Sequence, residues 1–246
     1  PGRRSVHGLR RNMLQEKKDS IKGKRCLVSG SGNVAQYSIE KIIDMGGKVV
    51  SASDSDGFIH DEAGFTKEKL QFLMDIKNNR RGRIKEYADK FSGVVYKEAD
   101  VSAQSNDLWN IPADCAFPCA TQNEINEKDA QNLVKNKLKL LCEGANMPTT
   151  IEGISVLIDN GVMYAPGKAS NAGGVATSGL EMAQNYTGMH WTAEKVDTTL
   201  REIMKNIHQT VLTTAKEYNK PGNYLIGANI AGFLKVARAM QAQGVI

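Results

Sequence analysis

The sequence predicts an α/β fold in which a doubly wound parallel sheet is followed by C-terminal bracing helices. The first observation is a regular alternation of short apolar and amphipathic segments between residues 25 and 165, joined by short connections. This alternation is typical of a parallel sheet wrapped by helices. The second is a glycine-rich turn directly after the first apolar segment, and the third is a change after residue 165 to long helical patterns.

The elements can be assigned in chain order. Six apolar segments are predicted strands: 25–29, 48–53, 94–97, 114–118, 138–142 and 162–165. The helices predicted between them are 33–45, 67–78, 80–90, 123–135 and 149–160. Six strands in two halves match the Rossmann plan, whose ligand crevice opens at the carboxyl ends of the strands. Further helices are predicted at 175–187, 193–218 and 228–241. The last is expected to pack against another surface because of its apolar stripe of Ile230, Phe233, Leu234, Ala237 and Met240.

The turn at 30–35, with the sequence GSGNVA, has the form of a dinucleotide-binding fingerprint. An apolar strand precedes it, an amphipathic helix follows it, and the acidic Asp54 comes about 20 residues later. In this interpretation Gly30 makes the tight turn, Gly32 lets the backbone approach a pyrophosphate, and Ala35 lets the helix pack close to the strand. The alternative is an ordinary strand-turn-helix.

Asp54 and a downstream basic cluster bear on the choice between NAD and NADP. An acid at this point accepts hydrogen bonds from the adenosine ribose and repels a 2′-phosphate, although a turn-forming Asp is the alternative. Cations favour a 2′-phosphate, and four of them lie at a predicted helix junction: Lys77, Arg80, Arg81 and Arg83. Solvated helix ends have the same composition, so both interpretations of the cluster stay open.

Three further segments are candidates for the crevice. Residues 120–124 follow the fourth predicted strand and residues 143–148 follow the fifth, which places both at the carboxyl edge of the sheet. Helix capping is the alternative for Thr121, whereas Gly144 is not explained by packing alone. Residues 171–178 form a predicted small-residue loop that offers exposed amides and a hydroxyl group to an anionic ligand.

Composition and charge favour a globular protein that binds neither nucleic acid nor membranes. Hydrophobic residues make up 41% of the chain and charged residues 24%. No stretch approaches the roughly 18 apolar residues of a membrane span, and no secretory signal is visible, so a cytoplasmic location is expected. The net charge is +5, of which residues 1–25 carry +7 and the rest −2. No aromatic platform accompanies these charges, so residues 1–20 are interpreted as a basic leader that is non-native or disordered.

Cysteines and histidines give no indication of a metal site. The cysteines lie in or beside apolar segments, at Cys26, Cys115, Cys119 and Cys142. The histidines are scattered, at His7, His60, His190 and His208. Buried, reduced thiols and no bound metal are therefore expected.

Four motifs taken together resemble the cofactor-binding half of hexameric glutamate dehydrogenase, in its NADP-preferring branch. They are VSGSGNVAQ at 28–36, PCATQNE at 118–124, EGANMPTT at 143–150 and NAGGVATSGLEM at 171–182. The resemblance implies reversible oxidative deamination of L-glutamate to 2-oxoglutarate and ammonia, with hydride transfer to NADP rather than NAD. It implies that the cofactor is bound by Gly30, Ser31, Gly32, Asn33, Val34, Asp54, Lys77, Ala120, Thr121 and Asn146. It also implies that the substrate is bound by Asn171, Val175 and Ser178.

The resemblance has consequences for domain organisation. In that family a substrate domain precedes this region and carries the acid–base groups and most of the hexamer contacts. We therefore expect no catalytic residue in this chain, no turnover by the chain alone, and a homo-hexamer for the complete enzyme. The expected division is a leader at 1–20, a dinucleotide-binding domain at 21–220, and a C-terminal helix at 221–246 that returns toward the substrate domain. The alternative is a non-catalytic dinucleotide-binding module.

Overall fold

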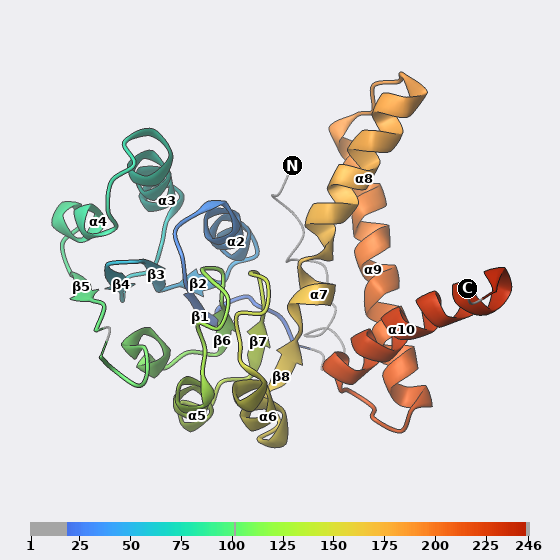
Figure 1. The fold of residues 1–246 in the computed structure, drawn as a ribbon. Helices are drawn as coiled ribbons and strands as arrows, with labels where there is room; N and C mark the ends of the chain where they lie inside the picture. Colours follow the sequence, from blue (N-terminus) through green and yellow to red (C-terminus); the bar gives the residue numbers. More distant parts are fainter. Residues whose placement is uncertain (1–18, 101, 245–246) are drawn as a thin grey trace.

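The computed structural model describes residues 19–100 and 102–244, so the predicted leader lies almost entirely outside the described residues. Two sheets are present in these ranges, one with five strands in the order β2-β1-β6-β7-β8 and one with three in the order β3-β4-β5. Figure 1 shows them crossing the body of the molecule from β5 to β8. The strands are β1 (Arg25–Val28), β2 (Lys48–Val49), β3 (Ser51–Asp54), β4 (Gly57–Asp61), β5 (Val94–Glu98), β6 (Cys115–Phe117), β7 (Leu140–Cys142) and β8 (Met163–Ala165).

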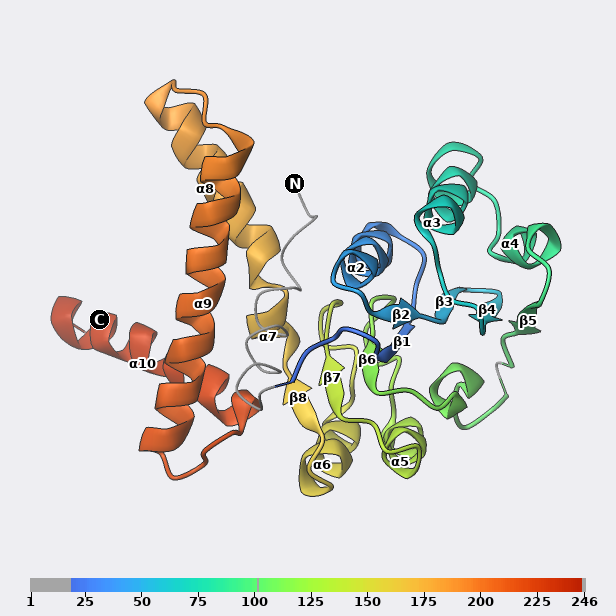
Figure 2. The ribbon, with the colours of Figure 1, turned by 180° about the vertical axis from the view of Figure 1, so that it is seen from behind.

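The helices form a layer on each side of the sheets and a group beside β8. Helices α2 and α3 lie on one side, α5 and α6 on the other, and α8 to α10 stand beside the last strand (Figures 1 and 2). Their bounds are α2 (Asn33–Asp44), α3 (Lys67–Met74), the π-helical η2 (Asp75–Asn79), α4 (Lys85–Lys90), the 3₁₀-helical η3 (Asp107–Asn110), α5 (Glu127–Lys135), α6 (Ile151–Asp159), α7 (Gly167–Ser170), α8 (Ala172–Thr187), α9 (Ala193–Glu217) and α10 (Tyr224–Gln243). Among the described residues, no helix combines the length and apolar character needed to cross a bilayer.

The predicted α/β class and parallel sheet are confirmed, but the sheet has five strands rather than six. The predicted strand at 48–53 is divided: β2 pairs with β1 in parallel, whereas β3 leaves the sheet and pairs antiparallel with β4. The sequence did not predict β4 as a strand. The predicted strand at 94–97 is β5, and it pairs antiparallel with β4 instead of joining the parallel sheet.

A tight turn between β3 and β4 causes this departure. The Asp54 carboxylate accepts a hydrogen bond from the Asp56 amide at 3.0 Å, an Asx turn that reverses the chain direction. Gly57 then lies so close to β5 that a Cβ atom there would be 2.2 Å from the carbonyl oxygen of Lys97. The Ser/Asp/Gly segment is thus a hairpin turn, and it draws β5 into a second sheet.

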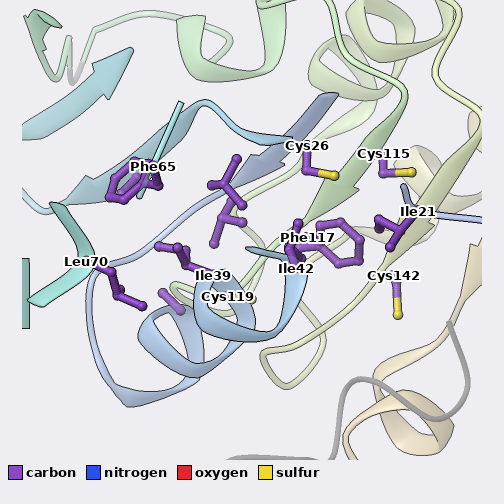
Figure 3. Packing of buried hydrophobic residues seen from close by; sticks show 14 of the residues in the cluster. Ile21, Cys26, Ile39, Ile42, Phe65, Leu70, Cys115, Phe117, Cys119 and Cys142 are labelled. Carbon is purple, nitrogen blue, oxygen red and sulfur yellow. The ribbon is translucent and has the colours of Figure 1, made fainter. Parts of the chain in front are cut away.

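Alternating side chains of the parallel strands build a buried cluster on each face of the sheet. In β1, Cys26 and Val28 join the cluster that includes Ile39 and Ile42 of α2, and Leu27 joins the opposite one. Figure 3 shows part of the first cluster. Full burial of one such aliphatic side chain stabilises the fold by about 1.5–3 kcal/mol. The predicted burial of all four cysteines is confirmed.

Helix boundaries differ from the prediction at two places. The helix predicted at 80–90 begins only at Lys85, because Arg81 adopts a left-handed φ of 54° that a continuous helix does not allow. The small-residue loop predicted before residue 175 is helical, because 167–170 form α7 and α8 begins at Ala172. Gly167 and Gly173 are buried in these helices, whereas a Cβ atom on Gly174 would have no protein atom within 4 Å.

Helix α10 packs differently from the prediction. It contacts α9 through its first turns, where Tyr224 and Gly227 are buried. The two helices diverge beyond this contact (Figure 1), so part of the predicted apolar stripe is exposed: Phe233 by 69% and Met240 by 46%. Ile230, Leu234 and Ala237 of that stripe are half-buried, so the expected packing is found for part of the stripe only. The domain boundaries predicted at residues 20 and 220 stay predictions.

Candidate functional site at the glycine-rich turn

The candidate site lies where two neighbouring parallel strands send their helices to opposite faces of the sheet. Strands β1 and β6 pair in parallel, and α2 and α5, the first α-helix after each, lie on opposite sides (Figure 1). Doubly wound proteins bind ligands at this switch point, outside the carboxyl ends of the strands. A pocket of about 240 Å³ lies beside it, between the ends of β3 and β5 and the start of α5.

The two glycines of the turn are required for different reasons. Gly30 has a φ of 80°, and a Cβ atom there would lie 2.8 Å from the carbonyl oxygen of Cys119. Gly32 has an extended backbone with a φ of −81°, and its Cβ atom would have no protein atom within 4 Å. The fold therefore explains Gly30, whereas the space at Gly32 is open to a ligand.

The first turn of α2 is also open. No side chain caps it and no acid lies in it, while Asn33 and Val34 are exposed. Backbone amides at such a helix start favour an anion. Of the predicted residues here, only Ser31 has a buried side chain, and its carbonyl oxygen accepts a hydrogen bond from Gln36 at 2.8 Å.

Asp54 lies at the end of β3 with its carboxylate already engaged. One oxygen accepts from the Asp56 amide, and the other accepts from the Ile84 amide at 2.9 Å and lies 3.4 Å from Lys77 Nζ. Its side chain is 6% exposed. Asp54 thus forms a turn, which was the alternative interpretation of this residue from the sequence. Lys77 lies against the same Asp54 carboxylate.

The basic cluster divides into two groups. Arg83 lies at the same turn as Lys77, with its guanidinium 2.7 Å from Ser55 Oγ and 3.0 Å from a carboxylate oxygen of Asp56. Arg80 instead bridges Asp75 and Glu86, at 2.8 and 2.6 Å. Two of the cations therefore flank the turn after β3, whereas Arg80 joins η2 to α4.

The loops after β6 and β7 contact each other at the crevice. Ala120, Thr121 and Asn146 are exposed there. The amides of Gly144 and Ala145 both donate to the carbonyl oxygen of Pro118, at 2.9 and 3.0 Å. A Cβ atom on Gly144 would lie 2.6 Å from Cys119 Sγ. Close packing therefore explains this glycine, contrary to the sequence-based interpretation.

The predicted substrate residues begin beside a predicted cofactor residue. Asn171 Nδ2 donates to Asn146 Oδ1 at 2.7 Å. Val175 and Ser178 follow at helical spacing on α8, and both are exposed, so the three lie along one side of the helix. The roles of these residues stay predictions.

Glu143 fixes the start of this helical group. It is buried, and its carboxylate accepts hydrogen bonds from the Tyr164 hydroxyl and the Gly167 amide, both at 2.7 Å. Burial raises the pKa of Glu143 above its ordinary value. Ser170 donates to the Glu143 carbonyl oxygen. The end of β7 and α7 are thus held together by one side chain and its own backbone.

Sequence reasoning missed three polar residues that hold the site together. Ser53 Oγ accepts from the Gly30 amide at 2.7 Å, and Ser29 Oγ accepts from the Cys119 amide at 2.9 Å. Glu124 Oε1 accepts from the Ala120 amide at 3.0 Å. The only signals in the sequence were the place of the two serines at strand ends and that of Glu124 within the candidate segment 120–124. In the described part of the chain, no group of three or more His, Cys, Asp or Glu residues is arranged to hold a metal ion.

The sheet order and the glycine-rich strand-turn-helix define a doubly wound α/β protein of the Rossmann type. Residues 3–244 match the Glutamate/Leucine/Phenylalanine/Valine dehydrogenase family. The chain belongs to this family.

Individual relatives agree with this assignment. The chain is 54% identical to the NADP-specific glutamate dehydrogenase of Haemophilus influenzae, over 95% of this chain and 51% of that protein. It is 53% identical to the Escherichia coli NADP-specific enzyme over the same shares of the two chains. The structure of Plasmodium falciparum glutamate dehydrogenase 2 superposes with a TM-score of 0.91 at 49% identity, covering 98% of this chain and 51% of that one. The chain thus spans about half the length of these relatives.

Proposed function

We propose that this chain is the NADP-binding portion of a glutamate dehydrogenase. The observation that carries the proposal is the open space at Gly32, above a first turn of α2 that no side chain caps. Amides at this turn, with Asn33 and Val34 beside them, hold the pyrophosphate. The exposed Ala120, Thr121 and Asn146 contact the nicotinamide end, where the bound cofactor accepts or gives up a hydride.

A substitution at Gly32 tests this proposal. Gly32→Val fills the open space with a branched side chain, so calorimetry should show NADP binding to wild type and at least tenfold weaker binding to the variant. Gly232→Val is the matched control, because Gly232 on α10 also has no atom within 4 Å of its Cβ position. Equal binding by wild type and Gly32→Val contradicts the assignment.

NADP is preferred to NAD because cations balance the acid at the adenosine end. Lys77 lies against Asp54, and Arg83 reaches Ser55 and Asp56 at the same turn, so a 2′-phosphate meets two cations as well as the two carboxylates they face. One charge-assisted hydrogen bond contributes about 1.5–3 kcal/mol, or about 10–100-fold in affinity. The NADP-specific names of the Haemophilus influenzae and Escherichia coli relatives support this preference.

The variants Lys77→Gln and Arg80→Gln test whether Lys77 recognises the 2′-phosphate directly or only adds to the net positive charge of the protein. Both remove one positive charge, but Arg80 is bound by Asp75 and Glu86 away from the turn. Lys77→Gln should weaken NADP binding about tenfold or more and leave NAD binding nearly unchanged, whereas Arg80→Gln should change neither. If Lys77→Gln weakens the binding of NADP and NAD equally, residues other than Lys77 determine the preference for NADP.

The complete protein catalyses reversible oxidative deamination of L-glutamate to 2-oxoglutarate and ammonia. Asn171, Val175 and Ser178 contribute to the substrate site, with the Ser178 hydroxyl facing the distal carboxylate of the substrate. The groups that move protons lie in the other half, so the 246-residue chain alone shows no turnover. A purified chain that oxidises glutamate contradicts this division.

The complete protein is a homo-oligomer, a hexamer as in the enzymes the sequence resembles. The exposed Phe233, Val236 and Met240 on α10 supply an apolar stripe that the rest of the protein covers. Light scattering on the complete protein tests the assembly, and a monomer contradicts it. Its cytoplasmic location stays a prediction from the sequence.

A further inference from the structure

Glu124 joins the glycine-rich turn to the loop that follows β6. Its carboxylate accepts from the Ala120 amide at 3.0 Å, and the Ser29 hydroxyl and the Thr121 amide also donate to it. Ser29 in turn accepts from the Cys119 amide at 2.9 Å. One carboxyl group therefore ties the end of β1 to Ala120 and Thr121, two of the three residues of the proposed nicotinamide site.

The surroundings of Glu124 disfavour its negative charge. It lines the acidic pocket beside the switch point, and none of the described residues lining that pocket is basic. The other acids lining the pocket are Asp54, Glu98, Asp100, Asp107 and Asp129. Burial is the main cause that raises the pKa of Glu124, to about 7, and the charge of Asp129 from α5 acts in the same direction.

Two of the neighbouring acids are compensated by cations. Asp54 has Lys77 at 3.4 Å, and Asp107 pairs with Lys97. Asp129 accepts from the amides of Asn106 and Asn126 in the capping of α5. From the described part of the chain, Glu124 receives hydrogen bonds from neutral donors only. Burial raises the pKa of Asp129 as well, but Glu124 is the carboxyl group that binds both the end of β1 and the loop after β6, and its pKa of about 7 lets it take up a proton near neutral pH.

We propose that Glu124 is a proton-linked positioning residue, which takes up one proton from solvent when a dinucleotide occupies the crevice. This inference rests on the proposed function. The pyrophosphate adds negative charge at Gly32, in the same turn as the Ser29 hydroxyl that Glu124 binds, and an added anion favours the neutral carboxyl group. A new O–H bond forms on the carboxylate, and no other bond changes. The neutral group keeps the loop at Ala120 against the turn without repelling the ligand.

Proton uptake on binding is measured by titration calorimetry of the 246-residue chain with NADPH at pH 7.5, in two buffers of different ionisation enthalpy. A rise of about one unit from a pKa of about 7 corresponds to uptake of about half a proton. The 2′-phosphate, with a pKa near 6, contributes equally in every variant. Glu124→Gln keeps the side-chain shape and cannot titrate, so it should lose this half proton. Glu98→Gln, which removes an exposed carboxylate from the same pocket, should retain it.

The pH dependence of affinity provides a second readout. Between pH 6.5 and 8.5, the wild-type affinity for NADPH should fall about sixfold more than that of Glu124→Gln, as expected for a one-unit rise from a pKa of about 7. Equal proton uptake and equal pH profiles in the two proteins overturn the inference. Failure of the wild type to bind NADPH at all overturns the proposed function instead.

A direct titration covers the case in which Glu124→Gln does not fold. Wild-type protein labelled with ¹³C at its glutamate carboxyl groups should show one that titrates near pH 7 and shifts to higher pH when NADPH is added. Glutamate signals whose titration is the same with and without NADPH overturn the inference.

Discussion

Replacing Gly30 with alanine is expected to lower the free energy of unfolding by about 2–5 kcal/mol. A left-handed backbone costs an L-residue about 1–2 kcal/mol, and Gly30 has a φ of 80°. The new Cβ atom would lie 2.8 Å from the carbonyl oxygen of Cys119 and 3.1 Å from the Cα atom of Ala120. Both are backbone atoms, so the loop after β6 has to move, at a further cost of about 1–3 kcal/mol.

Gly32→Ala is the matched control, because it adds the same methyl group two residues away. Its φ of −81° suits any residue, and nothing lies within 4 Å of the new atom. Stability should stay within about 0.5 kcal/mol of wild type or rise slightly, while NADP affinity falls.

Urea unfolding followed by circular dichroism measures the stability of both variants. We assign Gly30 to close packing and Gly32 to space for a ligand. This assignment is refuted if Gly32→Ala lowers the free energy of unfolding as much as Gly30→Ala does. A Gly30→Ala variant as stable as wild type refutes it as well.

Three further predictions concern packing and charge. Gly144→Ala should destabilise the protein less in a Cys119→Ala background, since its Cβ would lie 2.6 Å from Cys119 Sγ; a double-mutant cycle with no coupling contradicts this. Gly227→Ala should lower the free energy of unfolding by about 2 kcal/mol or more, because its Cβ would lie 2.2 Å from the carbonyl oxygen of Val211. Unchanged hydrogen exchange in the first turn of α10 would contradict this prediction. Burial raises the pKa of Glu143 above 4.5, so the stability that its protonated form contributes is lost as pH rises through the folded pKa. Glu143→Gln should therefore flatten the decline of the urea midpoint as pH rises above the ordinary pKa of a glutamate, and parallel profiles of the two proteins argue against this.

Local signals were sufficient for the parallel sheet but not for the second one. The strand before Gly30 and its turn form from adjacent residues, so their pattern is visible in one segment. Strand β4 has no such pattern: its pairing with β5 joins residues 57–61 to residues 94–98, far along the chain. Such pairing depends on tertiary contacts that periodicity does not encode.

The candidate site, like the fold, could be predicted from the sequence only in part. The sequence identified Asn146 and Asn171 as site residues, and a hydrogen bond joins them in the structure. It did not identify Glu124, because the property that distinguishes this carboxyl group is burial among other acids, which depends on the assembled pocket. The sequence also did not show that packing explains Gly144, since its neighbour Cys119 lies 25 residues earlier in the chain.

The Glu143 anchor has a geometric consequence for the helix that it holds. Helix α8 is a stiff rod of 16 residues, about 24 Å long at 1.5 Å per residue. Ser178 lies about 10 Å along this rod from Asn171, so tilting α8 by about 10° at its base would move the serine by about 2 Å. That displacement is larger than the tolerance of a hydrogen bond. The contacts of Glu143 with α7, at the base of α8, therefore affect how accurately a hydroxyl about two turns along α8 can meet a ligand.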